Sequence, residues 1–288
     1  MKKKTFLIGL CPLFTFFNIT QAQWKPLFNG TDLKSFVKKN GNAEYTIIDK
    51  AIVGISQLNT PNTFLCTQVE YGDFVLELEV KVDRGLNSGI QIRSISDKAI
   101  NNGRVHGYQV EIDPSERAWS GGIYDEARNG WLYPLSINQK GRKAFNNGEW
   151  NKYHIEAIGS SIKTWINGVQ CARLLDSQTA QGLIALQVHQ IKRPEQVGLT
   201  VQWRNIRIAT ENLHKVMIKG GEKAQEVNYL PNQLSENEVK NGWKLLWDGI
   251  NSVGWKIANG DAFPKNGWID ALYAHGRSNG FGRCYEKV

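Results

Sequence analysis

The chain has 288 residues, 41% of them hydrophobic and ten of them tryptophan, which is enough for a real core in one large domain or two smaller ones. Its net charge is +8, but Lys and Arg are spread along the chain without forming a basic stripe, which argues against nucleic acid as a partner. Beyond residue 22 three cysteines remain, Cys66, Cys171 and Cys284, and this odd, widely spaced set without a Cys-x-x-Cys pair indicates neither a disulfide framework nor a cysteine zinc site.

The first 22 residues have the pattern of a secretory signal peptide. Lys2–Lys4 are followed by an apolar run over residues 6–17 and by Thr20-Gln21-Ala22. A lipid anchor at Cys11 is disfavoured because a leucine stands before it, where a small residue is needed. No later segment approaches the ~20 apolar residues of a membrane helix. We therefore expect an exported protein, periplasmic or secreted, without an integral membrane segment after cleavage.

Residues 23–210 predict one all-β domain. Short β-rich runs alternate with Gly, Pro and Asn, which is typical of strands joined by tight turns. The clearest strand is 73–82, where apolar residues alternate with Glu and Lys. Asn167-Gly168 between two further runs predicts a hairpin with a type I′ turn. Residues 94–104 and 125–133 lack a strand pattern, so we expect a surface excursion and a structured loop there. The pattern favours a sandwich of many short strands.

The last 78 or so residues change character. Lys, Glu, Gln and Asn dominate 211–242, and Ser235 with Glu238 fits a capping box, so we expect a linker with a short helix near residue 236. Residues 243–249 then repeat the plan of 24–30. We interpret 243–288 as a truncated second copy of the domain, too short to close a sandwich and poorly ordered.

Polar residues alternate with apolar ones in three of the predicted strands, near residues 90, 110 and 187. If these strands are neighbours in a curved sheet, their polar side chains converge on one cleft. The expected floor consists of Gln91, Arg93, Gln109, Glu111, Asp113, Gln187 and His189, and the expected rim of Tyr124, Asp125, Glu126, Arg128 and Trp131.

Six motifs together resemble the 3-keto-disaccharide hydrolase domain family. They are Trp-Lys-Pro-Leu-Phe-Asn-Gly at 24–30, Ser-Gly-Ile-Gln-Ile-Arg at 88–93, Gly-Tyr-Gln-Val-Glu-Ile-Asp at 107–113, Gly-Glu-Trp-Asn-Lys-Tyr at 148–153, Trp-Ile-Asn-Gly at 165–168 and Trp-Arg-Asn-Ile-Arg-Ile at 203–208. The resemblance implies a concanavalin A-like jelly-roll sandwich with a sugar site on its concave sheet. It also implies cleavage of glycosidic bonds in sugars oxidised at C3, by hydrolysis or elimination. Residues 108–112 read Tyr-Gln-Val-Glu-Ile, where the family more commonly has Tyr-Glu-Val-Gln-Ile.

A 3-keto group acidifies the proton on C2 of the sugar, so a base can remove it while a cation steadies the enediolate. Glu111 is the candidate base, His189 an alternative base or acid, and Arg93 the electrostatic partner. Direct hydrolysis by Glu111 and Asp113 is the rival mechanism, since two carboxyls this close approach the ~5 Å spacing of retaining glycosidases. The residues Glu111, Asp113 and His189 also offer hard ligands for a divalent metal, although no ligand spacing demands one.

Two other functions fit the same residues. A lectin-like module would bind carbohydrate without catalysis, with Tyr124 and Trp131 stacking on a sugar ring. An ordinary glycosidase would act on unoxidised glucans. Taken singly, a Glu or Arg on a sheet face is more often just solvated, and His106 and His154 are more often structural or surface residues.

Overall fold

The computed structural model describes residues 24–246 and 285–287. Within these ranges no helix is long and apolar enough to cross a membrane. The predicted signal peptide lies outside the described residues, and so does most of the predicted second copy. Of the latter, only the short strand β17 (Trp243–Leu245) and its antiparallel partner β18 (Tyr285–Lys287) are described.

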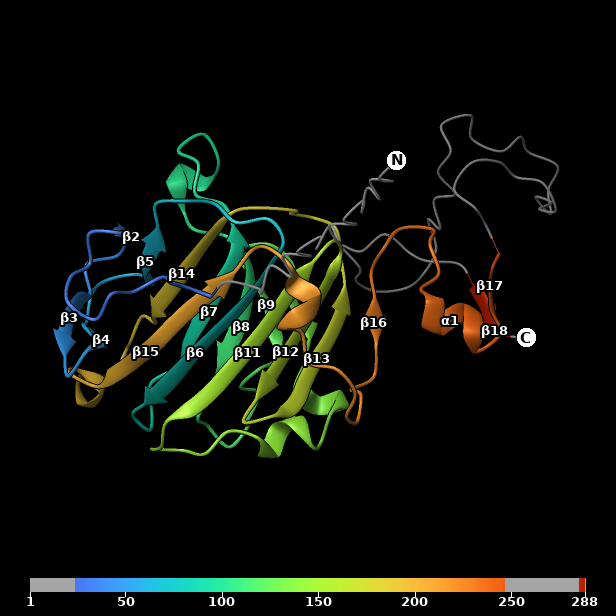
Figure 1. Ribbon diagram of the computed structural model, residues 1–288. Helices are drawn as coiled ribbons and strands as arrows, with labels where there is room; N and C mark the ends of the chain where they lie inside the picture. Colours follow the sequence, from blue (N-terminus) through green and yellow to red (C-terminus); the bar gives the residue numbers. More distant parts are fainter. Residues whose placement is uncertain (1–23, 247–284, 288) are drawn as a thin grey trace, which may run out of the picture.

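Two sheets pack face to face in the described part of the chain (Figure 1). The larger sheet contains β1 (Lys25–Pro26), β3 (Glu44–Ile48), β4 (Ala51–Ile55), β6 (Phe74–Val82), β11 (Asn151–Ile158), β12 (Ser161–Ile166), β13 (Val169–Leu175), β15 (Thr200–Ala209) and β16 (Val227–Asn228). Its strand order is β16-β13-β12-β11-β6-β15-β4-β3, with β1 paired to β15. All of these pairs are antiparallel except β13 with β16.

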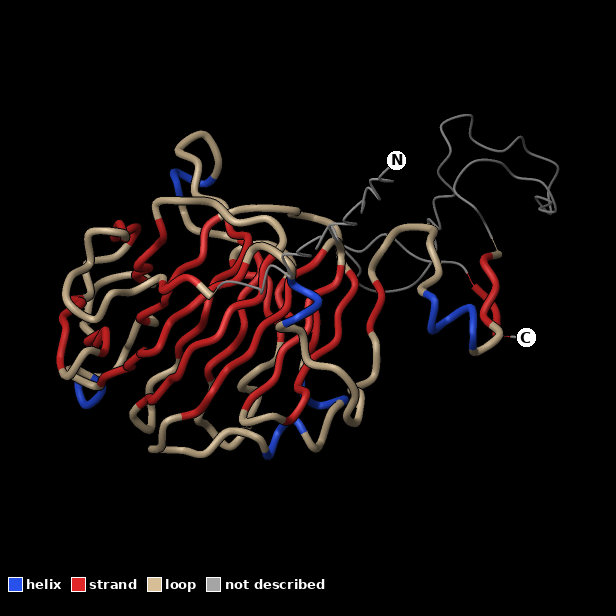
Figure 2. The backbone as a smooth tube through the Cα atoms, viewed as in Figure 1, coloured by secondary structure: helices blue, strands red, loops and turns tan. Residues whose placement is uncertain are grey.

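The smaller sheet has the order β10-β9-β8-β7-β14-β5-β2. Its strands are β2 (Phe36–Asn40), β5 (Thr63–Thr67), β7 (Ser88–Ser94), β8 (Gly107–Ile112), β9 (Ile123–Glu126), β10 (Gly130–Tyr133) and β14 (Leu183–Val188). The described helical turns are short: η1 (Asn101–Gly103), η2 (Leu135–Ile137), η3 (Gly141–Lys143), η4 (Pro194–Gln196), η5 (Leu213–Lys215) and α1 (Glu236–Lys240). Figure 2 shows how strands dominate and how loops join them at the two ends of the sandwich. The prediction of an all-β sandwich is thereby confirmed.

The two-residue period of the strands explains the core. In β6, Phe74, Leu76 and Leu78 are almost fully buried between the sheets, while Glu79 on the alternate face is partly exposed. The β12–β13 hairpin turns at Asn167 and Gly168, whose φ angles of 49° and 83° match the positive values that a type I′ turn requires.

One local expectation is wrong and another is confirmed. Residues 125–133 do not form a loop, because β9 and β10 pair as an antiparallel hairpin with a register irregularity between Trp131 and Tyr133. At the other end of the domain, Ser235 accepts a hydrogen bond from the backbone of Glu238, and a capping box starts α1 where the sequence predicts a short helix.

Candidate functional site

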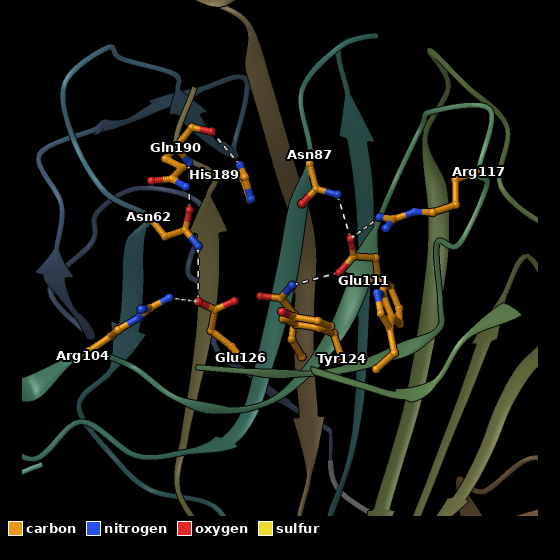
Figure 3. Close-up of a pocket in the computed structure, with 11 residues that line it drawn as sticks. Asn62, Asn87, Arg104, Glu111, Arg117, Tyr124, Glu126, His189 and Gln190 are labelled. Carbon is orange, nitrogen blue, oxygen red and sulfur yellow. Dashed lines mark hydrogen bonds and ion pairs between the residues drawn. The ribbon is translucent and has the colours of Figure 1, made fainter. Parts of the chain in front are cut away.

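A cleft of about 480 Å³ opens on the face of the smaller sheet that points away from the sandwich core (Figure 3). Its lining is mostly polar and comes from strands and loops that are far apart in the sequence. The lining residues are Asn62, Asn87, Arg104, Gln109, Glu111, Arg117, Tyr124, Glu126, Trp131, His189 and Gln190.

Strand register determines which side chains reach the cleft. Gln109 in β8 pairs with Tyr124 in β9, and Gly107 pairs with Glu126, so Gln109, Glu111, Tyr124 and Glu126 all stand on one face. Tyr124 in turn pairs with Trp131 in β10, and the two rings pack edge to face with centroids 5.1 Å apart. An aromatic wall therefore borders a floor of amides and carboxylates.

Glu111 is the most buried acid of this lining, with 3% of its surface exposed. Its Oε1 accepts a hydrogen bond of 2.7 Å from Asn87, and its Oε2 accepts one of 2.9 Å from Gln109. Burial raises the pKa of Glu111 to about 7, although these two hydrogen bonds and the charge of Arg117 act to lower it. The carboxylate can therefore exchange a proton near neutral pH.

Arg117 supplies a cation beside this carboxylate. Its Nη2 lies 3.4 Å from Oε1 of Glu111, and its Nε donates a 2.7 Å hydrogen bond to Asp113. Its guanidinium carbon is 4.9 Å from the ring centroids of both Trp119 and Trp131. An ion pair on one side and two aromatic rings on the other hold the guanidinium at the cleft wall.

Asp113 is buried behind Arg117 and is not among the residues that line the cleft. Burial acts to raise the pKa of Asp113, but hydrogen bonds from Ser115 and Arg117 outweigh it and lower this pKa. The predicted pairing of Glu111 with Asp113 as two carboxylates facing one substrate is therefore wrong. The guanidinium of Arg117 binds both carboxylates, and its bond to Asp113 is the shorter one, at 2.7 Å against 3.4 Å, so the carboxylate of Asp113 is taken up by this ion pair.

His189 stands at the opposite side of the cleft, where β14 has ended. Its Nδ1 donates a 2.6 Å hydrogen bond to the carbonyl oxygen of Gln190, which leaves Nε2 as the nitrogen with a free lone pair. Burial lowers the pKa of His189, so the neutral imidazole is the form present at neutral pH. The ring can accept a proton or a hydrogen bond at Nε2.

A second ion pair closes this side of the cleft. Arg104 donates a 2.9 Å hydrogen bond to Oε1 of the buried Glu126. Asn62 connects this ion pair to the segment that follows β14. Its Nδ2 lies 3.4 Å from Oε1 of Glu126, and its Oδ1 accepts a hydrogen bond from the backbone N–H of Gln190. Among the described residues, Glu111 and Glu126 are the two carboxylates that line the cleft.

Gln91 and Gln187 lie directly beneath the floor and are fully buried. Both donate hydrogen bonds to Oε1 of Gln109, at 2.7 Å and 2.9 Å. The predicted polar faces of three strands thus do meet at one place, although only Gln109, Glu111 and His189 of them reach the cleft surface itself.

The prediction that Arg93 acts in the cleft is wrong. The pairing of β7 with β14 shifts by one residue between Gln91 and Ser94, and Arg93 has a positive φ of 45°. This bulge reverses the alternation, so the side chain of Arg93 turns to the other side of the sheet. There the guanidinium is 1% exposed and hydrogen-bonds to the carbonyl oxygens of Gly72 and Gly159 and to the carboxylate of Asp73.

Asp125 and Arg128 also leave the predicted rim. Asp125 pairs with Tyr108 across the sheet and therefore points to the core side, where it is fully buried. Its carboxylate binds Arg128 and Asn129 at the β9–β10 turn. We interpret this group as support for the hairpin that carries Tyr124.

The described part of the chain contains no group of three or more His, Cys, Asp or Glu side chains arranged to hold a metal. Glu111, Asp113 and His189, which the sequence left open as ligands, do not gather around one point. Cys66 and Cys171 are free, buried thiols.

Sequence reasoning missed five lining residues, namely Asn62, Asn87, Arg104, Arg117 and Gln190. All five lie in loops or just beyond strand ends, where no periodic pattern exists. Asn87 directly precedes the Ser-Gly-Ile-Gln motif, and Arg117 lies between Asp113 and Trp119, directly after the Gly-Tyr-Gln-Val-Glu-Ile-Asp motif and its turn. Those two positions carried a usable signal, whereas nothing local marks Asn62, Arg104 or Gln190.

A family model described as "3-keto-alpha-glucoside-1,2-lyase-like domain" matches residues 23–209, which is more than half of the chain. The chain belongs to this family. The resemblance inferred from the six sequence motifs is thereby confirmed. The match ends before residue 243, so it does not extend to the predicted second copy.

Several solved structures are similar to this lyase-like domain. A candidate glycosyl hydrolase from Parabacteroides distasonis has 15% identity and a TM-score of 0.47, covering 66% of this chain and 94% of that one. A β-glucanase from Bacillus licheniformis has 11% identity and a TM-score of 0.42, covering 67% and 100%. A carbohydrate-binding module from Bacillus subtilis has 17% identity and a TM-score of 0.40, covering 61% and 95%. No curated protein sequence matches the chain.

Proposed function

We propose that residues 23–210 cleave the glycosidic bond of 3-keto-glycosides by base-catalysed elimination. The observation that carries this proposal is Glu111, a buried carboxylate in the cleft whose pKa is raised to about 7 and which has the guanidinium of Arg117 beside it. A base with a pKa near the working pH is the most effective kind of proton acceptor. Membership of a family named for a 1,2-lyase on 3-keto-glucosides supports this reaction.

Glu111 takes the C2 proton in the first step. A carboxylate has roughly four lone-pair positions, and three donors from Asn87, Gln109 and Arg117 occupy three of them. The remaining position is on Oε2, and it accepts the substrate proton. The electron pair of the C2–H bond then moves toward the C3 carbonyl and forms an enediolate.

Arg117 stabilises this enediolate in place of Arg93, because its guanidinium is at the cleft wall and partly open to a ligand. The electron pair next returns to form a C1–C2 double bond and breaks the bond from C1 to the glycosidic oxygen. The proton that Glu111 took moves to that oxygen, which leaves as an alcohol. The C3 ketone is restored, so the reaction needs no further reactant.

His189 offers the second base of the cleft through its free Nε2. Since Glu126 and Arg104 form an ion pair on the same side, we assign this side to holding the sugar hydroxyls while Glu111 acts on C2. Tyr124 and Trp131 form the wall on which a pyranose ring can pack.

The test is a product assay on matched disaccharides, oxidised or not oxidised at C3. We expect cleavage of the oxidised sugar alone, with exchange of its C2 hydrogen in deuterated water. Glu111→Gln should lower kcat at least about a hundredfold, because general-base catalysis contributes that much or more. Glu79→Gln, at a partly exposed carboxylate of the other sheet, should keep wild-type turnover. Unchanged turnover in Glu111→Gln would show that Glu111 is not the base that takes the C2 proton.

A non-catalytic carbohydrate-binding role is the second candidate, and the packed aromatic pair at the cleft wall favours it. This role requires affinity for a sugar without turnover, weakened by Trp131→Ala and unaffected by Glu111→Gln. Cleavage of unoxidised glucans by paired carboxylates is a third candidate, for which Glu126 would now have to take the place of Asp113. Release of reducing ends from unoxidised glucans distinguishes it.

We also propose that residues 1–22 direct export, so that the enzyme acts on sugars outside the cytoplasm. The measurement is the N-terminal sequence of the protein recovered from the periplasm or medium, which should start at Gln23. An uncleaved cytoplasmic protein would contradict this.

A further inference from the structure

A chain of buried amides runs beneath the cleft and ends on the carboxylate of Glu111. We propose that Gln91 and Gln187 are positioning residues that act through Gln109 to keep Glu111 ionised. This inference rests on the proposed role of Glu111 as the base. Gln91 and Gln187 are fully buried and do not line the cleft, so they act on a substrate only through Gln109.

The direction of the hydrogen bonds carries the argument. Gln91 and Gln187 both donate to Oε1 of Gln109, at 2.7 Å and 2.9 Å. The amide oxygen of Gln109 accepts both hydrogen bonds, so the NH2 group of Gln109 points the other way. It points to Oε2 of Glu111, 2.9 Å away. An amide NH2 donates and does not accept, so this contact favours the carboxylate over the carboxylic acid.

At the end far from Glu111, the hydrogen bonds of the amide series run in the same direction. The hydroxyl of Ser94 donates a 2.7 Å hydrogen bond to Oε1 of Gln91, which leaves the NH2 of Gln91 to face Gln109. Gln187 keeps its orientation although its Oε1 is buried without a hydrogen-bond partner among the described residues. Reversing the amide of Gln187 would set two oxygens against each other. The orientation of the Gln187 amide is therefore determined by its hydrogen bond to Gln109 and not by a hydrogen bond to its own oxygen.

The backbone makes room for this chain at Gly89. A Cβ atom at Gly89 would lie 2.3 Å from Cδ of Gln109, so any other residue would displace the amide. Gly89 pairs with Glu111 across β7 and β8, directly beside the carboxylate. The glycine of the Ser-Gly-Ile-Gln motif thus lets Gln109 reach across β7 to Gln187 on the next strand.

The test follows the titration of the Glu111 side-chain carboxyl by carbon-13 NMR, with the signal assigned through its absence in Glu111→Gln. Methionine has the length of glutamine without its amide. Either donor alone can still orient Gln109, so Gln91→Met and Gln187→Met should each raise the titration midpoint a little. The double variant should raise it by about one pH unit, more than the two single shifts together. Gln170→Met, at a buried glutamine of the other sheet, is the control and should leave it unchanged.

On a 3-keto-glucoside, the acidic limb of the pH–rate profile should move upward in parallel. A wild-type midpoint in the double variant, or an equal shift in the Gln170→Met control, would overturn the proposal. If the double variant does not fold, the absence of a shift in both single variants overturns it instead. The titration needs no turnover, so it still decides the matter if the proposed reaction fails.

Discussion

Replacing Glu111 by glutamine should stabilise the folded protein relative to the wild type as the pH rises from 4.5 to above 7. Burial raises the pKa of Glu111 from 4.5 to about 7, so the folded protein holds this proton more tightly than the unfolded chain does. Between these two pH values the unfolded chain loses the proton first. The wild type therefore loses stability through this window, and a glutamine, which does not ionise, does not.

The magnitude follows from the change in pKa. At about 1.4 kcal/mol per pH unit, the rise from 4.5 to about 7 corresponds to about 3 kcal/mol in the free energy of unfolding. Glu111 is almost fully buried, so solvent screens this effect little. Below pH 4.5 the difference between variant and wild type should be constant, and it should be constant again above pH 7.

The assay is urea denaturation of both proteins at several pH values between 4 and 8.5. Every other group titrates in both proteins, so the difference between the two curves isolates Glu111. Glu79→Gln is the control for the substitution itself. Parallel stability curves for the wild type and Glu111→Gln, or a difference of the opposite sign, would refute the reasoning that burial dominates this carboxyl.

Three further expectations concern the framework around the cleft. Arg93→Met should lower the free energy of unfolding by about 3 kcal/mol, because the buried guanidinium binds two carbonyl oxygens and a carboxylate. The kcat per folded molecule should not change, and Arg84→Met, at an exposed arginine, is the control. A loss of kcat without a loss of stability would show that Arg93 does act in the cleft. His154→Gln should cost more stability at pH 5 than at pH 9, as measured by thermal unfolding. Burial acts to lower the pKa of His154, but hydrogen bonds to two glutamates outweigh it and raise this pKa above 6.5. The stabilisation by His154 is therefore full below pH 6.5 and is lost as the pH rises through the pKa of the folded protein. Gly89→Ala should lower kcat at least about tenfold and lower the free energy of unfolding by about 1–3 kcal/mol, because the added Cβ displaces Gln109. Wild-type kinetics in this variant would show that the position of Gln109 does not matter for turnover.

Much of the sandwich could be predicted because it depends on local rules. The alternation in 73–82 and the Asn167-Gly168 turn involve neighbouring residues only, and both have the predicted geometry. The same alternation correctly placed Gln109 and Glu111 on one face. It was wrong for Arg93, where one extra residue in β7 reverses the pattern without leaving a mark in the sequence.

The cleft depends on contacts that no local pattern contains. Arg117 reaches Glu111 because a turn folds back beside β8, and Asn62 meets Glu126 from 64 residues away. The raised pKa of Glu111 likewise requires burial, which only the packed fold provides. The sequence by itself determined most of the strands, the family and the face that carries the acid, but not the β9–β10 hairpin or the bulge in β7. The tertiary structure alone decided which cation stands beside that acid, because loop positions follow from long-range packing and not from the period of a strand.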